Sequence, residues 1–462
     1  MSYPLVVLLL GLGTVIGLIL VLRLNAFVAL ITAAMLVSLL APGEPGKQMV
    51  RLAESFGTAA GKFAVVIALA SIIGKCLMDS GAADRIVRSF LRALGEKRAP
   101  EALLGSGFVL AVPVFFDTVF YLVVPLARSL WRQTRKNYLL YILAIGVGGA
   151  TTHTLVPPTP GPLAVAGTLG IDLGVMILGG ILIGLPTAAV GMMMARLLNR
   201  LIVVPMRPYP GEAEVEPLAD ERLPGLGVSL VPILLPVVLI AGNTASKMLA
   251  QAQPAALAAW VDLDALAAVM AVLGDANLSL LVSAVVAMGL LVRQRGLTLA
   301  ELGKATEDAL MSGGVIILIT AAGGAFGAML AEAKVGDAVK EMFAVHSQTS
   351  GMVMLAMAFS VAALLKTAQG SSTVAMITTA GMISAMGLST EMLGFNMVYV
   401  ATAIAGGSLV CSWMNDSGFW VVARMSGMTE TEALKTWTVT IAVLGCAVGA
   451  FSALAAWLVP LA

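Results

Sequence analysis

A short polar stretch interrupts an apolar part of the sequence at residues 364–381. It contains groups that can bind an anion, namely Lys366, Gln369, Gly370, Ser371, Ser372 and Thr373. Such groups are costly at membrane depth unless they face protein or a water-filled cavity. If the chain turns at Gly370, a new helix begins at Ser371, and its free amides and positive dipole end suit a carboxylate. The hydroxyls either contact the ligand or cap the helix. We predict that these residues bind a small organic anion.

An acidic residue, Asp117, lies in a second interrupted segment, VPVFFDTVFYLVVPLA (112–127), where Pro113 breaks the helix. Burial disfavours the charged form of a carboxyl group, so Asp117 is a candidate proton carrier. Alternatively, it caps the following helix or pairs with Lys366. Lys366 itself is expected to pair with the anion, or instead with Asp117 or Asp416.

The segment GATTHTLVPPTPGPLAVAG (149–167) has several prolines in succession, which forbid a continuous helix. Its unwound backbone would offer free carbonyls and amides to a substrate. The predicted contacts here are Thr152, Pro157, Pro158 and Gly161. His153 precedes the break and is either a proton carrier or a hydrogen-bonded packing residue.

A fourth polar interruption lies within GGSLVCSWMNDSGFWVVARMSG (406–427). Ser412 and Asn415 are predicted substrate contacts, since an amide both donates and accepts hydrogen bonds. Asp416 is expected to carry a proton, coordinate a cation or cap the next helix. Alternatively, the segment is only a loop at the membrane edge.

The composition predicts an all-α polytopic membrane protein. Hydrophobic residues make up 59% of the 462 residues, charged residues only 11%, and the mean hydropathy is +0.97. Soluble domains carry about 25% charged residues. A net charge of +1 gives no sign of a nucleic-acid partner, and three scattered cysteines predict neither a disulfide framework nor a metal site. No cofactor is expected. The N-terminal apolar run is interpreted as a membrane helix and not as a signal peptide.

Apolar runs predict five crossings in each half of the chain. They cover residues 4–22, 26–42, 57–78, 138–156 and 173–196, then 226–242, 277–292, 309–331, 394–413 and 436–460. Segments 103–130 and 351–388 are predicted re-entrant hairpins. Basic loops lie at 75–101, 132–136, 196–207 and 293–304. Placing them in the cytoplasm puts both chain ends outside and makes the two hairpins enter from opposite sides.

The two halves resemble each other. SIIGKCLMDSGAADRIV (71–87) is similar to AGGAFGAMLAEAKVGDAVK (322–340) when Gly74 is matched to Gly327, and AIGVGGATTH (144–153) is similar to AIAGGSLVCSW (403–413). An odd number of crossings per half inverts the second copy. We therefore predict inverted repeats at 1–198 and 226–462, joined by a cytoplasmic linker at 199–225, with broken helices that meet at the midplane.

These motifs together resemble the gluconate:proton symporter family (GntP-type permeases) of the ion-transporter superfamily. The resemblance rests on FFDTVF, THTLVPPTPGP (152–162), GSSTVA (370–375), SWMNDSGFW (412–420) and LGD (273–275), and it covers nearly the whole chain. It implies proton-coupled uptake of sugar acids or related hydroxy- or amino-acid anions, opposed hairpins, a homodimeric scaffold and elevator-type movement.

The chain departs from the family pattern at several sites. Asp117 stands where the family typically has Glu, Thr159 and Trp413 stand at positions of His, and Ser417 replaces Pro. These differences leave related acids and another coupling ion open.

The predicted function is secondary active import of a small organic anion, such as gluconate or a related hydroxy acid, by proton symport across the inner (cytoplasmic) membrane. The proton would be carried by Asp117, with His153 and Asp416 as further candidates. A sodium-coupled carboxylate or amino-acid transporter is the alternative. An intramembrane enzyme is a more distant one, because the sequence has no GxSxG or HExxH motif.

Overall fold

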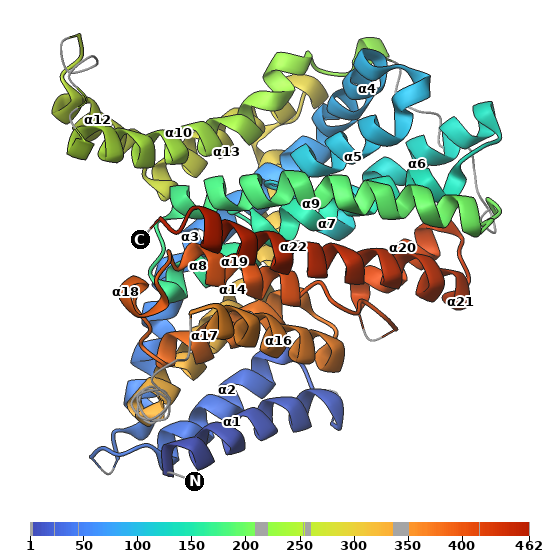
Figure 1. Ribbon diagram of the computed structural model, residues 1–462. Coiled ribbons are helices and arrows are strands. Elements are labelled where there is room, and N and C mark those ends of the chain that lie inside the picture. The colour runs from blue at the N-terminus through green and yellow to red at the C-terminus, as the bar shows by residue number, and fades with distance from the viewer. Residues whose placement is uncertain are drawn as a thin grey trace.

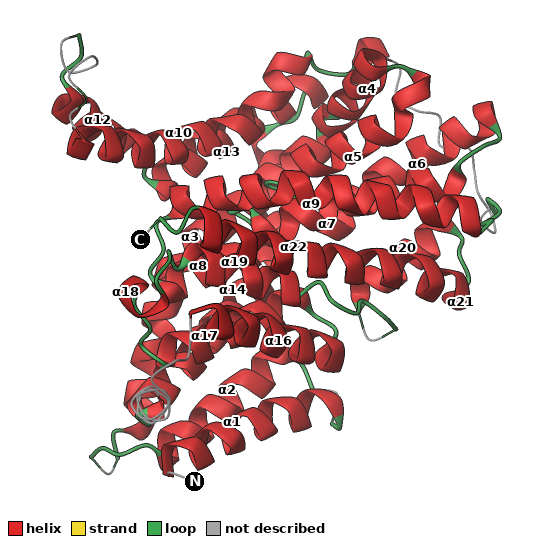
Figure 2. Cartoon of the chain, in the orientation of Figure 1, coloured by secondary structure: helices red, strands yellow, loops and turns green. Residues whose placement is uncertain are grey.

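The computed structural model describes residues 3–22, 24–44, 46–207, 220–252, 254, 260–335, 351–414 and 416–461. This part of the chain is helical and contains no strand (Figure 2). Six of its helices are long and apolar enough to cross a membrane, and α3 adds a seventh if its bent halves count as one span. The predicted all-α membrane class is therefore confirmed. Most of the predicted linker, residues 208–219, lies outside the described residues.

A helix lies in each of the predicted apolar runs, but the helices over 57–78, 226–242 and 309–331 extend nine or ten residues beyond the predicted bounds. The first half holds α1 (Tyr3–Leu20), α2 (Ala26–Leu40), α3 (Gln48–Asp79), α4 (Ala82–Leu94), α5 (Ala99–Leu110), α6 (Phe116–Thr134), α7 (Tyr138–Leu155), α8 (Pro160–Leu169) and α9 (Leu173–Leu201). The second half holds α10 (Leu226–Ala252), α12 (Leu263–Leu273), α13 (Ala276–Arg295), α14 (Leu299–Glu332), α16 (Gly351–Gln369), α17 (Ser372–Ala385), α18 (Thr390–Leu393), α19 (Val398–Gly407), α20 (Ser417–Ser426), α21 (Glu430–Ala433) and α22 (Val439–Leu458).

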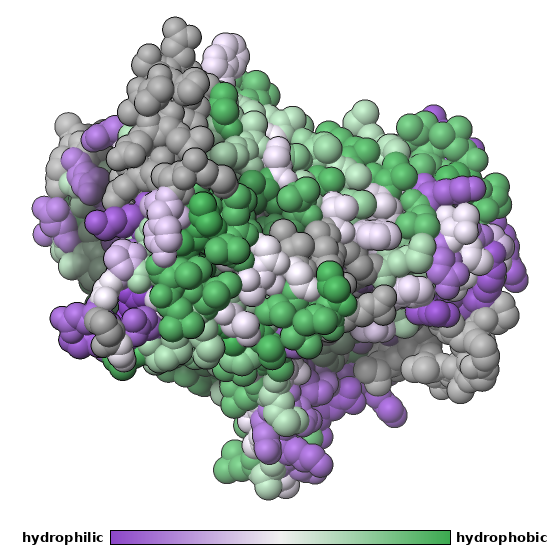
Figure 3. Space-filling model, turned by 90° about the horizontal axis from the view of Figure 1, so that it is seen from below, coloured by the Kyte–Doolittle hydropathy of each residue, from purple (hydrophilic) through white to green (hydrophobic). Residues whose placement is uncertain are grey.

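The surface has the distribution expected of a membrane protein. Apolar side chains cover the middle of the face seen in Figure 3, and hydrophilic side chains gather toward its left, right and lower edges. Both marked chain ends lie on the left in Figure 1.

Helices α3 and α14 pack along each other in the middle of the molecule, and small residues make this possible. A Cβ added at Gly324 would lie 2.6 Å from the Cβ of Ala59, and one at Gly313 would lie 2.7 Å from the Ser71 hydroxyl. Close approach of this kind, through small residues, is typical of membrane helices. Helix α3 also bends by 42° just after Lys62.

Four helices end near the centre of the protein, at the polar stretches that the sequence singled out. Helix α5 ends at Leu110 before α6, α7 ends at Leu155 before α8, and α16 gives way to α17 at Gly370, whose φ is +86°. The helix predicted over 394–413 is shorter than expected, because α19 ends at Gly407 and α20 begins only at Ser417. The polar SWMNDSG segment interrupts this span, as the prolines interrupt α7 and α8.

The units α5–α6 and α16–α17 have their free ends at opposite ends of α9. Near the C-terminal end of α9, Arg196 hydrogen-bonds Glu101 at the start of α5, and Asn199 bonds Asn137 just after α6, 3.1 Å away. At the other end, the Ser384 hydroxyl of α17 donates to the Thr168 carbonyl, 3.1 Å away and just before α9. A helix of this length spans about 40 Å, so the two units approach the centre from opposite directions (Figure 1).

Two helix pairs, one in each half of the chain, have a similar close backbone contact. A Cβ at Gly148 of α7 would lie 2.1 Å from the Leu104 carbonyl oxygen of α5. A Cβ at Gly407 of α19 would lie 2.1 Å from the Phe359 carbonyl oxygen of α16. The pair α5–α7 therefore has the same kind of backbone contact as the pair α16–α19.

Candidate functional site

The four polar stretches meet at one cavity of about 350 Å³. Its wall is formed by the turn before α6, the end of α7, the turn before α17, the segment between α19 and α20, and parts of α14 and α22. Eight of the predicted site residues line it: Asp117, His153, Lys366, Ser371, Ser372, Thr373, Ser412 and Asp416. The sequence stretches thus converge in space although they are far apart in the chain.

A buried ion pair joins two of these stretches. The Lys366 amine lies 2.7 Å from Asp416 Oδ2 and donates a second hydrogen bond of 2.6 Å to the Gly370 carbonyl. Only 1% of Lys366 is exposed. Of the partners that the sequence left open for Lys366, the structure shows Asp416. Hydrogen bonds beyond the ion pair, such as the one from Lys366 to Gly370, lower the cost of burying the two charges.

The Asp416 carboxylate is held by further donors. It accepts hydrogen bonds from the Ser412 hydroxyl and, at 3.0 Å, from the Gly418 amide, which makes it the N-cap of α20. The Trp437 indole N–H donates to the Ser412 hydroxyl at 2.9 Å. The same Trp437 ring stacks on Phe116, with 5.5 Å between centroids. Asp416 therefore connects Lys366, Ser412 and the start of α20.

Three helix N-termini face the cavity. Residues of the first turns of α6, α17 and α20 line it, including Asp117, Thr373 and Gly418. The Ser371 hydroxyl accepts from the Val374 amide at 3.3 Å and caps α17, whereas no side chain caps α6. Helix N-termini carry partial positive charge and unpaired amides, so their convergence favours an anionic ligand.

Two titratable groups at the cavity have no hydrogen-bond partner among the described residues. The Asp117 carboxyl is half-buried and lies near enough to Asp416 and Lys366 for their charges to act on it. His153 Nδ1 is buried without a partner, and its ring meets Phe115 edge-on at 6.3 Å between centroids. Both groups are therefore available to a ligand or a proton.

Other predicted contacts lie outside the cavity wall. Thr152 is fully buried with no partner for its hydroxyl among the described residues, and neither Pro157 nor Pro158 lines the cavity. Gly161 has a packing role, because a Cβ there would lie 2.8 Å from the sulfur of Met376 in α17. Gly370 contributes through its carbonyl, which accepts the hydrogen bond from Lys366.

The two remaining predicted contacts are Asn415 and Gln369. Asn415 lies outside the described residues, and the same holds for the side chain of Gln369.

Four wall residues lie outside the stretches that the sequence singled out: Ser312 and Ile316 on α14, Trp437 just before α22, and Ile441 on α22. Ser312 lies in the apolar run 309–331 and Trp437 at the beginning of the run 436–460, and both runs predict ordinary membrane crossings. Only the tertiary packing turns these side chains toward the cavity. Among the described residues, no cluster of three or more His, Cys, Asp or Glu could hold a metal ion.

Comparison with known proteins gives the family of the chain. Residues 3–459 match the model of the GntP family permeases. The chain belongs to the GntP permease family. GntP permeases similar to this chain include the gluconate permease of Pseudomonas aeruginosa, 34% identical over 95% of both chains, and the inner membrane permease YgbN of Escherichia coli, 32% identical over 94% of both chains. This GntP-family chain is therefore a multi-pass membrane permease and not an enzyme.

Solved structures with the same fold are also transporters. The YdaH transporter of Alcanivorax borkumensis superposes with a TM-score of 0.64, at 14% identity over 94% of this chain and 98% of that one. MtrF of Neisseria gonorrhoeae, described as one of a class of antimetabolite efflux pumps, also gives 0.64, at 15% identity over 100% of this chain and 99% of that one. At such low identity these likenesses concern the fold alone.

Proposed function

We propose that this GntP-family permease imports a gluconate-type sugar acid, or a related hydroxy acid, together with protons. The observation that carries the proposal is the convergence of three helix N-termini on a cavity that also holds Asp117 and the Lys366–Asp416 pair. The substrate carboxylate would lie at the N-terminus of α17, where Ser372 and Thr373 offer amides and hydroxyls. The names of the gluconate permeases among its relatives support the same substrate class.

Asp117 is the group that couples the anion to a proton in this proposal. Lys366 and Asp416 neutralise each other, so an ionised Asp117 gives the cavity a net negative charge that repels a carboxylate. Protonation of Asp117 removes that repulsion. The anion and the proton therefore bind most favourably together, which is the requirement for symport. His153, with its unpartnered Nδ1, is the second proton candidate.

The architecture proposed for this transport is two inverted repeats, residues 1–198 and 226–462, with α5–α6 and α16–α17 as re-entrant hairpins. It is supported by the opposite directions from which these units reach the centre and by the equivalent contacts at Gly148 and Gly407. Elevator-type movement and a homodimer belong to the same proposal.

The substitution Asp117→Asn tests the coupling role. The amide keeps the size of the side chain but carries no ionisable proton, so we expect proteoliposomes to lose uphill uptake of D-gluconate driven by a proton gradient. Exchange of internal for external D-gluconate should persist, because exchange needs no net proton movement.

Asp264→Asn is the matched control, since this exposed carboxylate on α12 lies outside the cavity. A mutant Asp117→Asn that still concentrates D-gluconate against its gradient would contradict the assignment.

A further inference from the structure

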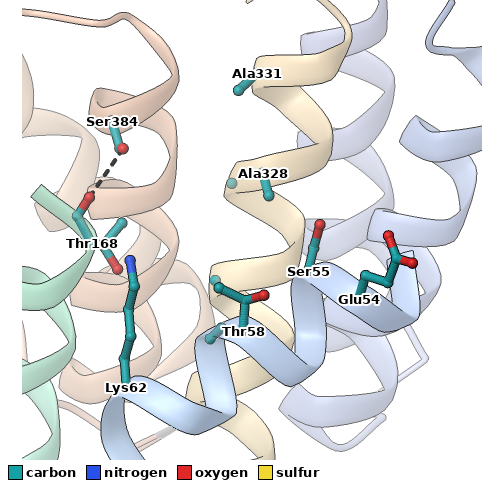
Figure 4. A pocket seen from close by; sticks show the side chains of 11 residues that line it. Glu54, Ser55, Thr58, Lys62, Thr168, Ala328, Ala331 and Ser384 are labelled. Atoms are coloured by element: carbon teal, nitrogen blue, oxygen red, sulfur yellow. Dashed lines mark hydrogen bonds between the residues drawn. The ribbon is translucent and has the colours of Figure 1, made fainter. Parts of the chain in front are cut away.

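A second polar cavity of about 400 Å³ lies apart from the central one and shares no wall residue with it. Figure 4 shows its polar side chains. Lys62, Thr58, Ser55 and Glu54 project from α3, while Thr168 and Ser384 lie across from them at the ends of α8 and α17. Glycines and alanines of α14 form the floor and keep the space open.

The charges in this cavity are separated. The Lys62 amine points toward Thr168, whereas the Glu54 carboxylate lies at the far end of the row on α3 (Figure 4). Among the described residues Lys62 forms no salt bridge. The Ser384 hydroxyl is bonded to the Thr168 carbonyl, 3.1 Å away, and this bond fixes the wall opposite Lys62.

This set of groups matches a polyhydroxylated carboxylate. An unpaired ammonium group binds a carboxylate by a charge-assisted hydrogen bond. The hydroxyls of Ser55, Thr58 and Thr168 can both donate to and accept from ligand hydroxyls, and Glu54 accepts hydrogen bonds at the other end. A purely apolar acid would leave these polar groups unsatisfied, which costs binding energy.

A third cavity, of about 310 Å³, helps to place the second cavity relative to the two sides of the membrane. The sequence match of Gly74 to Gly327 also relates wall residues of the two cavities. Under this match, Ser71, Lys75 and Met78 of the third cavity correspond to Gly324, Ala328 and Ala331 of the second cavity. The reverse shift takes Asp308 and Ser312 of α14 to Ser55 and Ala59 of α3. The α3 and α14 parts of the two walls are thus related by the shift that relates the two halves, which supports equivalent places for the two cavities.

The third cavity adjoins the central one, since both are lined by Phe115, Thr118 and Ser312. It lies at the end of α3 where Arg295 bonds the Asp79 carbonyl, beside the basic segment of α4. That end faces the cytoplasm by the positive-inside rule. Its counterpart around Lys62 then lies toward the outside.

We propose that the Lys62 cavity is a second binding site for a polyhydroxylated monocarboxylate at the outer mouth of the transport path. Lys62 pairs with the carboxylate of an incoming molecule there, before the molecule occupies the central cavity. The inference rests on the proposed function for the identity of the ligand, but the site and its residues are separate from it.

The first test is binding of radiolabelled D-gluconate to the purified full-length protein by equilibrium dialysis. Wild-type protein should bind a second molecule per chain at high concentration. Lys62→Gln should lose this second molecule and keep the first, and Lys62→Arg should retain both. A single site in wild-type protein, or two sites in Lys62→Gln, overturns the inference.

The second test is uptake into right-side-out vesicles. Lys62→Gln should raise the KM for external D-gluconate about tenfold, the factor expected for one lost charge-assisted contact, with an unchanged maximal rate. Lys47→Gln is the control, because Lys47 lies just before the same helix but outside the cavity. An unchanged KM in Lys62→Gln beside normal wild-type transport contradicts the second site alone. Absence of D-gluconate binding and transport in wild-type protein contradicts the proposed function as well.

Discussion

Lys366 and Asp416 are the buried charges around which the central cavity is built. Each carries hydrogen bonds beyond the ion pair, from Lys366 to the Gly370 carbonyl and to Asp416 from Ser412 and Gly418. Together they tie the turn before α17 to the start of α20. The pair therefore holds two helix N-termini at the cavity and is itself electrically neutral.

Removal of one partner should be far more harmful than removal of both charges. Lys366→Met leaves the buried Asp416 carboxylate unpaired, and breaking a buried pair in this way costs about 3–5 kcal/mol. We expect a clear fall in the unfolding midpoint of the protein in detergent. The double variant Lys366→Met with Asp416→Asn should regain much of that loss but not uptake. A single variant as stable as the wild type would contradict a structural role for the pair.

The sequence did not single out this pairing, because three partners were open to Lys366: the anion, Asp117 and Asp416. Asp117 and Asp416 lie on different segments, and only the fold decides which carboxylate reaches the amine. In the structure Asp416 is fixed by its role as the N-cap of α20, while Asp117 stays without a partner among the described residues. This division leaves Asp117 free for the proposed proton chemistry.

At the scale of helices, close backbone contact holds the two halves of the cavity together. Helix α7 touches α5 at Gly148, and α19 touches α16 at Gly407. Any side chain at either position meets a carbonyl oxygen that cannot move away without shifting its helix. These glycines therefore set the position of the broken helices that end at the cavity.

Gly148→Ala should push α5 away from α7. Its Cβ would lie 2.1 Å from the Leu104 carbonyl oxygen, and overpacking of this kind costs about 1–3 kcal/mol. We expect a lower unfolding midpoint and a lower uptake rate. Gly289→Ala on α13 is the control, because nothing lies within 4 Å of its added Cβ. Equal stability of the two variants would show that the contact between α5 and α7 is not tight.

Most helix breaks were predictable because they have local causes. The prolines after Leu155 stop α7, Pro113 precedes α6, and Gly370 adopts a positive φ that other residues avoid. The direction in which a side chain points from an unbroken helix has no such local signal. Ser312 and Trp437 were missed for this reason, since only packing against other helices turns them toward the cavity.

For the whole molecule, two of the three cavities are neighbours and the Lys62 cavity lies apart. The central cavity shares wall residues with the one near the basic end of the protein and none with the one at Lys62. The similarity of residues 71–87 to 322–340 was visible in the sequence. The sequence did not show that the matched positions line two cavities at different places on α3 and α14, because this depends on how these helices pack.

Ion dependence of uptake by the wild-type protein is the measurement that tests the central claim most directly. Proteoliposomes would be given radiolabelled D-gluconate with an inward proton gradient and no sodium, then with a sodium gradient at equal pH on both sides. The account predicts accumulation above the external concentration in the first case, acidification of the vesicle interior as substrate enters, and no accumulation in the second. Accumulation that requires sodium, or none under either gradient, would contradict proton-coupled import of a sugar acid.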